Sequence, residues 1–344
     1  MYIVFAIKRA LKLNNSEASL MAKHAGFKRV VYNFGLSLRQ QMYGQSKLSD
    51  AKILDTAKKV LTKHVKKRPE YAWMNELSSR VYQHAFIDLK TAFSRYRKGV
   101  SKHPRYASRR DGQSFTVDNS AGKSFLARGN TIKIPTLGVF RLYEPLMTGY
   151  VTQTFNLTRE GDRWYVSFCV DASRLPVNYA QDAVGIDVGV KTFATLSNTE
   201  TIEAPKPLKQ AKNKLQKLQR TAASRQVRGS RNQHKTYDKI RCLHARVSNV
   251  RKDFLHKLTT YLAKTFKLIK SEDLNVSGLL ANHKLAGAIA DLGFYEFKRQ
   301  LTYKCQMYGA NLVLVDKMVS VNKDLFILWQ CSANAIVRTG LHLF

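Results

Sequence analysis

This sequence has few acidic residues, no paired cysteines and no long apolar run. Its 344 residues hold 24 Asp and Glu against 58 Lys and Arg, a formal net charge of +34. So large an excess of positive charge argues for a polyanionic partner, and nucleic acid is the first candidate. The alternatives are a ribosomal-type RNA-binding protein and a protein bound to a membrane surface. A membrane surface usually requires a basic amphipathic helix or a lipid signal, and neither dominates this sequence.

The cysteines and the apolar residues exclude further classes of protein. Cys169, Cys242, Cys305 and Cys331 form no C-x-x-C pair, so no zinc site can be read from them. Scattered thiols fit a reducing cytosol, and we expect a cytoplasmic, nucleoid-associated protein. No apolar run approaches the ~18 residues that a membrane helix needs, so we expect no membrane partner. Hydrophobic residues nevertheless make up 44%, which excludes a disordered basic tail and suits two or three modules with cores.

The spacing of the apolar residues changes along the chain. The first residues alternate as in a strand, and a helical stretch then opens with Ser16 as a candidate N-cap and continues to about residue 98. Residues 98–110 form a basic loop. From 114 to 171 the period is two, which predicts a small β-barrel or sandwich interrupted by the preceding helices. A linker follows at 171–178.

A third region mixes strands with basic helices, so the expected fold class is a multidomain α+β chain. Its predicted elements are strands at 183–189 and 192–197, helices at about 207–224 and 233–266, a strand ending at Glu272, a helix at 292–308 and a strand at 310–316. The second of these helices has an apolar stripe, and Lys and Arg cover its other faces. Those charges are either a solvated face or a surface that contacts a nucleic-acid backbone, and the net charge favours the second.

Two carboxylates stand at the ends of short apolar strands. Asp187 lies between Gly185 and Gly189, where small neighbours would let a phosphate approach, although it could equally be a hairpin or N-cap residue. Glu272 ends another apolar strand, and a buried carboxylate is costly unless it is paired or bound to metal. Asp273 beside it could instead cap the next helix. Two Mg²⁺ ions about 3.5–4 Å apart can cut a phosphodiester if several carboxylates hold them, so the pair suggests part of a nuclease site.

Six segments of the chain match one known family in order. They are residues 28–33, 83–93, 103–110, 185–191, 271–276 and 313–317. Through them the chain resembles TnpB, also called OrfB, the insertion-sequence protein related to type V CRISPR effectors, over nearly everything up to residue 317. The resemblance implies a monomer that takes a guide RNA from the transposon end and cleaves a matching double-stranded DNA target with Mg²⁺. It also implies that Asp187 and Glu272 are the first and second catalytic, metal-coordinating carboxylates of a RuvC domain.

The resemblance further implies a division into domains. In chain order, they are a WED-like β-barrel domain (1–13 and 112–172) with an inserted helical REC-like bundle (14–111), an RNase H-like RuvC domain (182–317) with a basic helical pair (207–266), and an aberrant tail (318–344). The basic segments and the matching motifs provide the candidate contacts to nucleic acid, where Lys and Arg neutralise phosphates. These candidates are Arg29, Asn33, Arg105, Arg109, Arg110, Lys191, Arg241, Arg246, Arg251 and Lys252.

The tail at 318–344 departs from the family pattern. The family continues with a zinc ribbon of two C-x-x-C pairs and a third catalytic Asp, whereas this tail holds one cysteine, Cys331, and one acidic residue, Asp324. Read one nucleotide forward, the codons of Leu325–Phe326 and of Leu328–Trp329 can each contain TGT for cysteine, which would give a C-x-x-C pair. We therefore expect that a frameshift replaced the ribbon, that the family's Zn²⁺ site is absent and that the nuclease is inactive. A nuclease-dead guided regulator and a plain basic RNA-binding protein are the alternatives.

Overall fold

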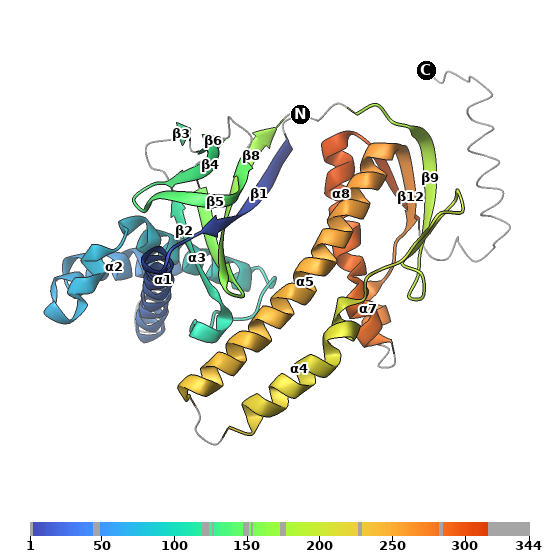
Figure 1. The fold of residues 1–344 in the computed structure, drawn as a ribbon. Helices are drawn as coiled ribbons and strands as arrows, with labels where there is room; N and C mark the ends of the chain where they lie inside the picture. Colours follow the sequence, from blue (N-terminus) through green and yellow to red (C-terminus); the bar gives the residue numbers. More distant parts are fainter. Residues whose placement is uncertain are drawn as a thin grey trace, which may run out of the picture. The chain divides into compact units, whose positions relative to one another are not determined.

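The computed structural model describes most of the chain up to residue 315. The described residues are 3–43, 49–118, 124–125, 127–146, 151–152, 154–172, 177–225, 229–281 and 285–315. The predicted tail at 318–344, with the frameshift inferred there, lies outside them. The chain divides into two compact units, one of residues 4–171 and one that begins at residue 172 (Figure 1).

The first unit is built on a six-stranded sheet with the order β2-β7-β8-β1-β5-β4. Its strands are β1 (Ile3–Lys12), β2 (Gln113–Asp118), β4 (Ala127–Ile134), β5 (Gly138–Leu146), β7 (Thr154–Glu160) and β8 (Arg163–Ala172), and β3 (Ser124–Phe125) pairs separately with β6 (Val151–Thr152). Among the described residues β2 and β4 are the two edge strands of this order, and the closed barrel stays a prediction.

Three long helices accompany this sheet in the first unit. They are α1 (Asn15–Met42), α2 (Asp50–Lys63) and α3 (Ser79–Arg97), with short 3-10 helices η1 (Val65–Lys67), η2 (Pro69–Glu76) and η3 (Arg109–Asp111). The prediction that Ser16 caps the first helix is wrong: Asn14 is the N-cap, because its side chain accepts from Glu17 N while the Glu17 carboxylate accepts from Asn14 N. Phe27, Phe115 and other fully buried side chains fill the core between helices and sheet.

The second unit is a five-stranded sheet with the order β11-β10-β9-β12-β13. Its elements are β9 (Gln181–Val188), β10 (Ala194–Leu196), β11 (Thr201–Ile202), α4 (Pro207–Ala223), α5 (Arg231–Thr265), β12 (Phe266–Glu272), α6 (Val276–Leu280), α7 (Ala286–Leu292), α8 (Phe294–Tyr308) and β13 (Asn311–Val315). Strands β9, β10 and β11 are joined antiparallel, and β12 runs parallel to both β9 and β13. The helix pair α4–α5 leads from β11 to β12, and α8 leads from β12 to β13.

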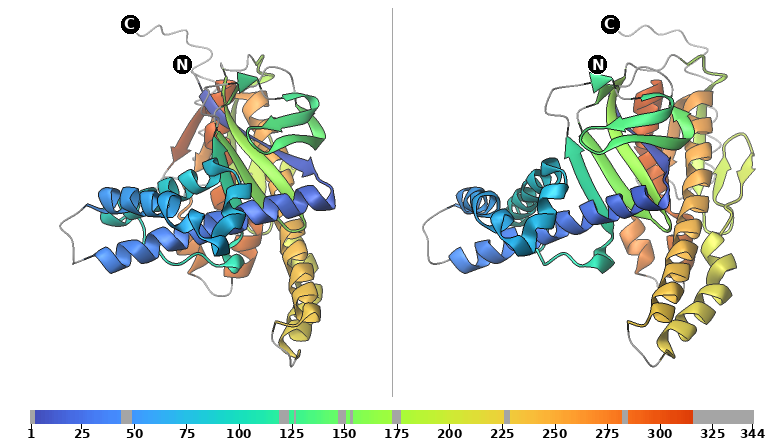
Figure 2. Two further views of the ribbon diagram at one scale, coloured as in Figure 1. Left: turned by 90° about the vertical axis from the view of Figure 1, so that its left-hand side faces the viewer. Right: turned by 60° about the vertical axis from the view of Figure 1, so that its left-hand side comes forward.

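The core of the second unit lies between its sheet and the helices α5 and α8. Val184 and Ile186 of β9 and Ile269 of β12 are buried in one cluster with apolar residues of those helices, including Leu258 and Phe297. The helices α4 and α5 lie side by side and extend beyond the sheet as a hairpin (Figure 2). No described helix combines the length and the apolar composition that crossing a membrane requires.

Candidate functional site

Asp187 and Glu272 occupy the same level of two neighbouring parallel strands. The register pairs Ser271 of β12 with Ile186 of β9, so the next residues of the two strands, Glu272 and Asp187, come side by side. Ile186 and Ser271 are buried, whereas Asp187 is exposed and Glu272 is half-buried. Because side chains alternate between the faces of a sheet, the two carboxylates project from the face opposite to the buried pair.

The same row continues across the sheet on both sides. Thr195 of β10 pairs with Asp187, and Val315 of β13 pairs with Glu272. The carboxyl ends of β12 and β13 therefore meet beside Asp187. Asp316, the next residue of the chain, lies outside the described residues.

Asp273 takes a different role from its neighbour Glu272. Its carboxylate forms an ion pair with Lys298 of α8, and its backbone N–H donates to Val315 O at 2.8 Å. The following helix α6 is capped by Asn275, whose side-chain oxygen accepts from Gly278 N at 3.0 Å. The alternative in which Asp273 caps this helix is therefore wrong, because Asn275 occupies the cap.

The carboxylate pair has oxygen atoms to offer a cation. Within the described residues, neither Asp187 nor Glu272 has a hydrogen bond or an ion pair that would occupy its oxygens. Carboxylate oxygens are the ligands that Mg²⁺ prefers, so the donor set fits a hard cation. Two carboxylates are fewer than a closed site needs, and the described residues contain no cluster of three or more His, Cys, Asp or Glu that could hold a metal.

The two glycines around Asp187 have local structural roles. A Cβ at Gly189 would come 2.9 Å from the Thr192 carbonyl oxygen, so the turn between β9 and β10 requires glycine there. Gly185 exchanges hydrogen bonds with Ser197: its N–H donates to Ser197 Oγ at 3.1 Å, and its carbonyl accepts from Ser197 N at 2.9 Å. The close approach of the Thr192 carbonyl therefore accounts for Gly189 without a phosphate.

Of the basic residues predicted to contact nucleic acid in the second unit, four are exposed to solvent and one has a buried partner within the protein. Lys191, in the turn after β9, and Arg241, Arg246 and Lys252, on α5, are exposed. Arg241 also pairs with Asp238 at 2.6 Å, one turn earlier on the helix. Exposed ion pairs of this kind contribute little to stability, so these cations remain available to a polyanion.

Arg251 differs from the other predicted contacts because its charge already has a buried partner. Its guanidinium lies 3.1 Å from Asp291 of α7, whose side chain is 5% exposed. Asp291 also accepts from the N–H groups of Leu208 and Lys209 at 3.0–3.1 Å. It thereby caps the start of α4, where the N-cap residue provides no side-chain hydrogen bond. Arg251 thus holds a helix junction together, and sequence spacing gave no signal of this.

The remaining candidates lie in the first unit. Arg105 and Arg109 are exposed in the loop before β2, Arg29 is half-buried on α1, and the side chain of Arg110 lies outside the description. Both polar atoms of the Asn33 amide bind the backbone of Ala107: Nδ2 donates to its carbonyl at 3.0 Å, and Oδ1 accepts from its N–H at 2.8 Å. Asn33 therefore ties the loop to α1.

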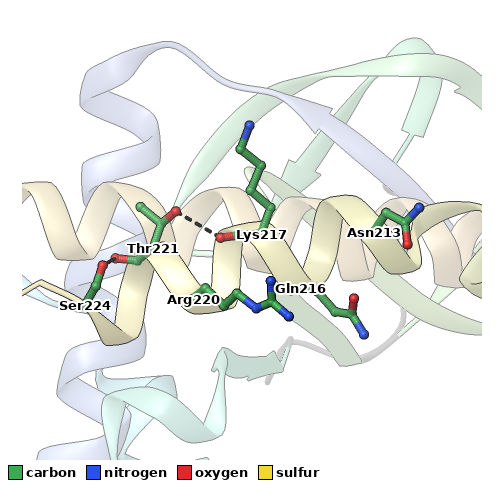
Figure 3. A pocket seen from close by; sticks show the side chains of 6 residues that line it. All are labelled: Asn213, Gln216, Lys217, Arg220, Thr221 and Ser224. Atoms are coloured by element: carbon green, nitrogen blue, oxygen red, sulfur yellow. Dashed lines mark hydrogen bonds between the residues drawn. The ribbon is translucent and has the colours of Figure 1, made fainter.

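A shallow hollow along the solvent side of α4 adds to the basic character of the hairpin. It is lined by Asn213, Gln216, Lys217, Arg220, Thr221 and Ser224 (Figure 3). Hydrogen bonds from Thr221 Oγ1 to the Lys217 carbonyl and from Ser224 Oγ to the Thr221 carbonyl turn these hydroxyls toward the helix backbone. The sequence of α4 contains lysines and one arginine but no acidic residue, so this face suits anions.

Comparison with known proteins places this arrangement in a family. A family model described as "Probable transposase" matches residues 167–283, and one described as "Helix-turn-helix domain" matches residues 1–47. A Streptomyces pristinaespiralis protein named "Putative RNA-guided DNA endonuclease" is 33% identical over 92% of this chain and 79% of its own length. The chain belongs to the TnpB/OrfB family.

Other TnpB/OrfB relatives extend the comparison. A "Putative RNA-guided DNA endonuclease" of Escherichia coli is 28% identical over 90% of this chain and 80% of its own length. A "TnpB-like protein" of Acanthamoeba polyphaga mimivirus is 26% identical over 56% of this chain and 40% of its own length. The comparison with a chain of the solved "Cas12f1-sgRNA-target DNA complex" covers 92% of this chain and 89% of the solved chain. The identity is 12% and the TM-score is 0.46, so this likeness supports no argument.

The matched regions can be located on the TnpB/OrfB structure. The transposase match runs from β8 to α6 and includes both Asp187 and Glu272. The match described as helix-turn-helix covers a strand and a helix, β1 and α1, and the next helix, α2, begins only at Asp50. In this chain the amino-terminal match is therefore a strand–helix unit over its described residues.

Proposed function

We propose that this TnpB/OrfB chain binds, as a monomer, a guide RNA from its transposon end together with a matching double-stranded DNA. The second unit would be the RuvC-like domain and the first would comprise the WED-like and REC-like parts. The names of the relatives support a guided DNA-binding function, and the net charge of +34 supports a polyanionic partner. The observation that carries the proposal is the register that brings Asp187 beside Glu272 on adjacent parallel strands.

Asp187 and Glu272 would hold Mg²⁺ on the open face of the sheet. When bound, the ion would supply Lewis-acid stabilisation of the charge on a phosphodiester. The exposed lysines and arginines of α4 and α5 would bind the nucleic-acid backbone, because each neutralised phosphate releases counterions. The site requires both carboxylates to be free of protein partners, as they are among the described residues.

We further propose that this 344-residue chain binds its target but cleaves it weakly or not at all. Two carboxylates hold a metal loosely, and displacement at phosphorus requires both the attacking and the leaving oxygen to be held. The segment after residue 317 lacks the paired cysteines that the family resemblance leads us to expect there, and its one acidic residue, Asp324, follows no ribbon motif. This supports a frameshifted, guided binder, with the parent activity lost.

Cleavage and binding are measured together to test the proposal. The assay uses guide RNA transcribed from the locus, target DNA and Mg²⁺ with three proteins: this chain, a form with the reading frame restored after Lys317, and the restored form carrying Asp187→Ala. We expect all three to bind guide and target, and only the restored form to cut. Strong cutting by the 344-residue chain that is abolished by Asp187→Ala would contradict the inactivity. Absence of guided binding by all three would contradict the function itself.

A further inference from the structure

The loop between α3 and β2 is held in place at several points although it has little regular structure. Besides the two hydrogen bonds between Asn33 and Ala107, Tyr106 Oη donates to Gln40 Oε1 of α1 at 2.7 Å. Asp111 closes the end of the loop by accepting from Ser108 N at 2.7 Å and from Arg105 at 2.9 Å. Such a loop is ordered before any ligand arrives, so binding does not have to supply the entropy of ordering it.

Aromatic rings join this loop to the carboxyl-terminal ends of α1 and α3. The His103 ring meets the edges of Phe93 at 5.6 Å and Tyr96 at 5.0 Å between centroids. The Arg39 guanidinium lies over the rings of both Phe93, at 4.5 Å, and Tyr43, at 4.0 Å. One contiguous cluster therefore connects the loop with both helices, and Phe93 is its buried centre.

Around this buried centre, several rings and cations remain open to solvent. Tyr43 is 66% exposed, Tyr106 48% and Tyr96 43%. Lysines and arginines lie beside Tyr96 and Tyr106 along the sequence, and each of them is exposed. We call this set the aromatic–basic surface; it consists of Tyr43, Tyr96, Lys98, Lys102, His103, Arg105, Tyr106 and Arg109.

Exposed rings among cations match one class of ligand. Tyrosine faces stack on unpaired bases of any sequence, and lysines and arginines between them neutralise the phosphates. A duplex hides its base faces within the helix and would use only the cations, which leaves the exposed tyrosines without a role. We propose that the aromatic–basic surface binds single-stranded nucleic acid by base stacking, with Asn33 as a positioning residue for the loop; this inference rests on the proposed nucleic-acid function.

The test compares strands that differ only in their bases. The full chain is titrated by fluorescence anisotropy with labelled oligo(U), oligo(dT), an abasic strand of the same length and a duplex. Replacing both rings, Tyr96→Ala with Tyr106→Ala, should weaken binding of oligo(U) or oligo(dT) at least about 5-fold for each ring, and leave the abasic strand unchanged. Tyr106→Phe keeps the ring and loses only the bond to Gln40, so it should bind almost as the parent does. Tyr237→Ala, at an exposed ring of α5, is the matched control.

A second measurement on the unaltered chain locates the contact independently of folding in the variants. A strand with 5-iodouracil is crosslinked by light, and the modified peptides are identified by mass spectrometry. Crosslinks at Tyr43, Tyr96 or Tyr106 support the site. Whichever of oligo(U) and oligo(dT) binds more tightly identifies RNA or DNA as its ligand. Crosslinks confined to α4 and α5, or equal loss of affinity for abasic and base-containing strands, would overturn it. Failure of the parent chain to bind any strand would instead remove the proposed function.

Discussion

Lys304 of α8 is buried in the second unit and forms no ion pair with a carboxylate of the described residues, and it provides a quantitative test of the fold. Its ammonium donates to the His256 carbonyl at 2.6 Å, to Thr259 Oγ1 at 2.9 Å and to Thr260 Oγ1 at 2.7 Å, all on α5. The side chain is almost inaccessible to solvent. Burial disfavours the charged form and lowers the pKa of Lys304 from 10.5 to about 8.

The sign and size of the effect follow from this depressed pKa. Below about pH 8 the folded and unfolded chains both hold the proton, and the full cost of burying the charge is present. Between about pH 8 and 10.5 the unfolded chain binds more protons than the folded chain, so the free energy of unfolding rises with pH. A difference of one in pKa corresponds to about 1.4 kcal/mol. The free energy of unfolding therefore rises by about 3 kcal/mol in total across this pH range.

Lys304→Met should remove this contribution, since methionine fills a similar volume and carries no proton. Urea unfolding of the helices is followed by circular dichroism at pH 8 and at pH 10.5 for the parent, Lys304→Met and Lys257→Met. The last variant removes a lysine that is exposed on α5 and controls for the loss of one positive charge. At pH 8 the free energy of unfolding of Lys304→Met should exceed that of the parent. This difference should be smaller by about 3 kcal/mol at pH 10.5. If the free energy of unfolding changed equally with pH in Lys304→Met and in Lys257→Met, the reasoning would be refuted.

Three further outcomes are expected. Asn33→Ala should remove both hydrogen bonds to Ala107 and speed hydrogen exchange of the amides of residues 103–111, whereas unchanged protection would mean that other contacts hold the loop. Asp291→Ala should lower the free energy of unfolding by about 3 kcal/mol, because it leaves the Arg251 charge unpaired and the start of α4 uncapped; urea titration measures this, and a loss below 1 kcal/mol would count against a structural role. The logarithm of the affinity for nucleic acid should fall linearly with the logarithm of the salt concentration, and a flat response in a filter-binding series would remove the electrostatic interpretation.

The sequence did not reveal which polar residues have buried partners within the protein. Arg251 and Asn33 were both predicted to contact nucleic acid, from a basic helix face and from a matching motif. The structure gives Arg251 a buried carboxylate and gives Asn33 the backbone of a loop 74 residues away in sequence, and their contact with nucleic acid stays a prediction. Lys304 and Asp291 raised no signal at all, because a single charged residue in a helical pattern looks the same whether it faces water or a neighbouring helix.

The sequence by itself determined the family, the basic character and the order of the longer elements in the second unit, whereas the short elements β11, α6 and α7 were not predicted. Local periods of 2 and 3.6 residues are properties of neighbours along the chain, so they survive without knowledge of the fold. Only the tertiary structure decided that Asp187 and Glu272 share one row of the sheet. Their adjacency depends on the parallel register of β9 and β12, since a slip of one residue would turn one carboxylate toward the buried face. Long-range pairing of strands, and the burial that fixes it, sets that register, and no local pattern encodes it.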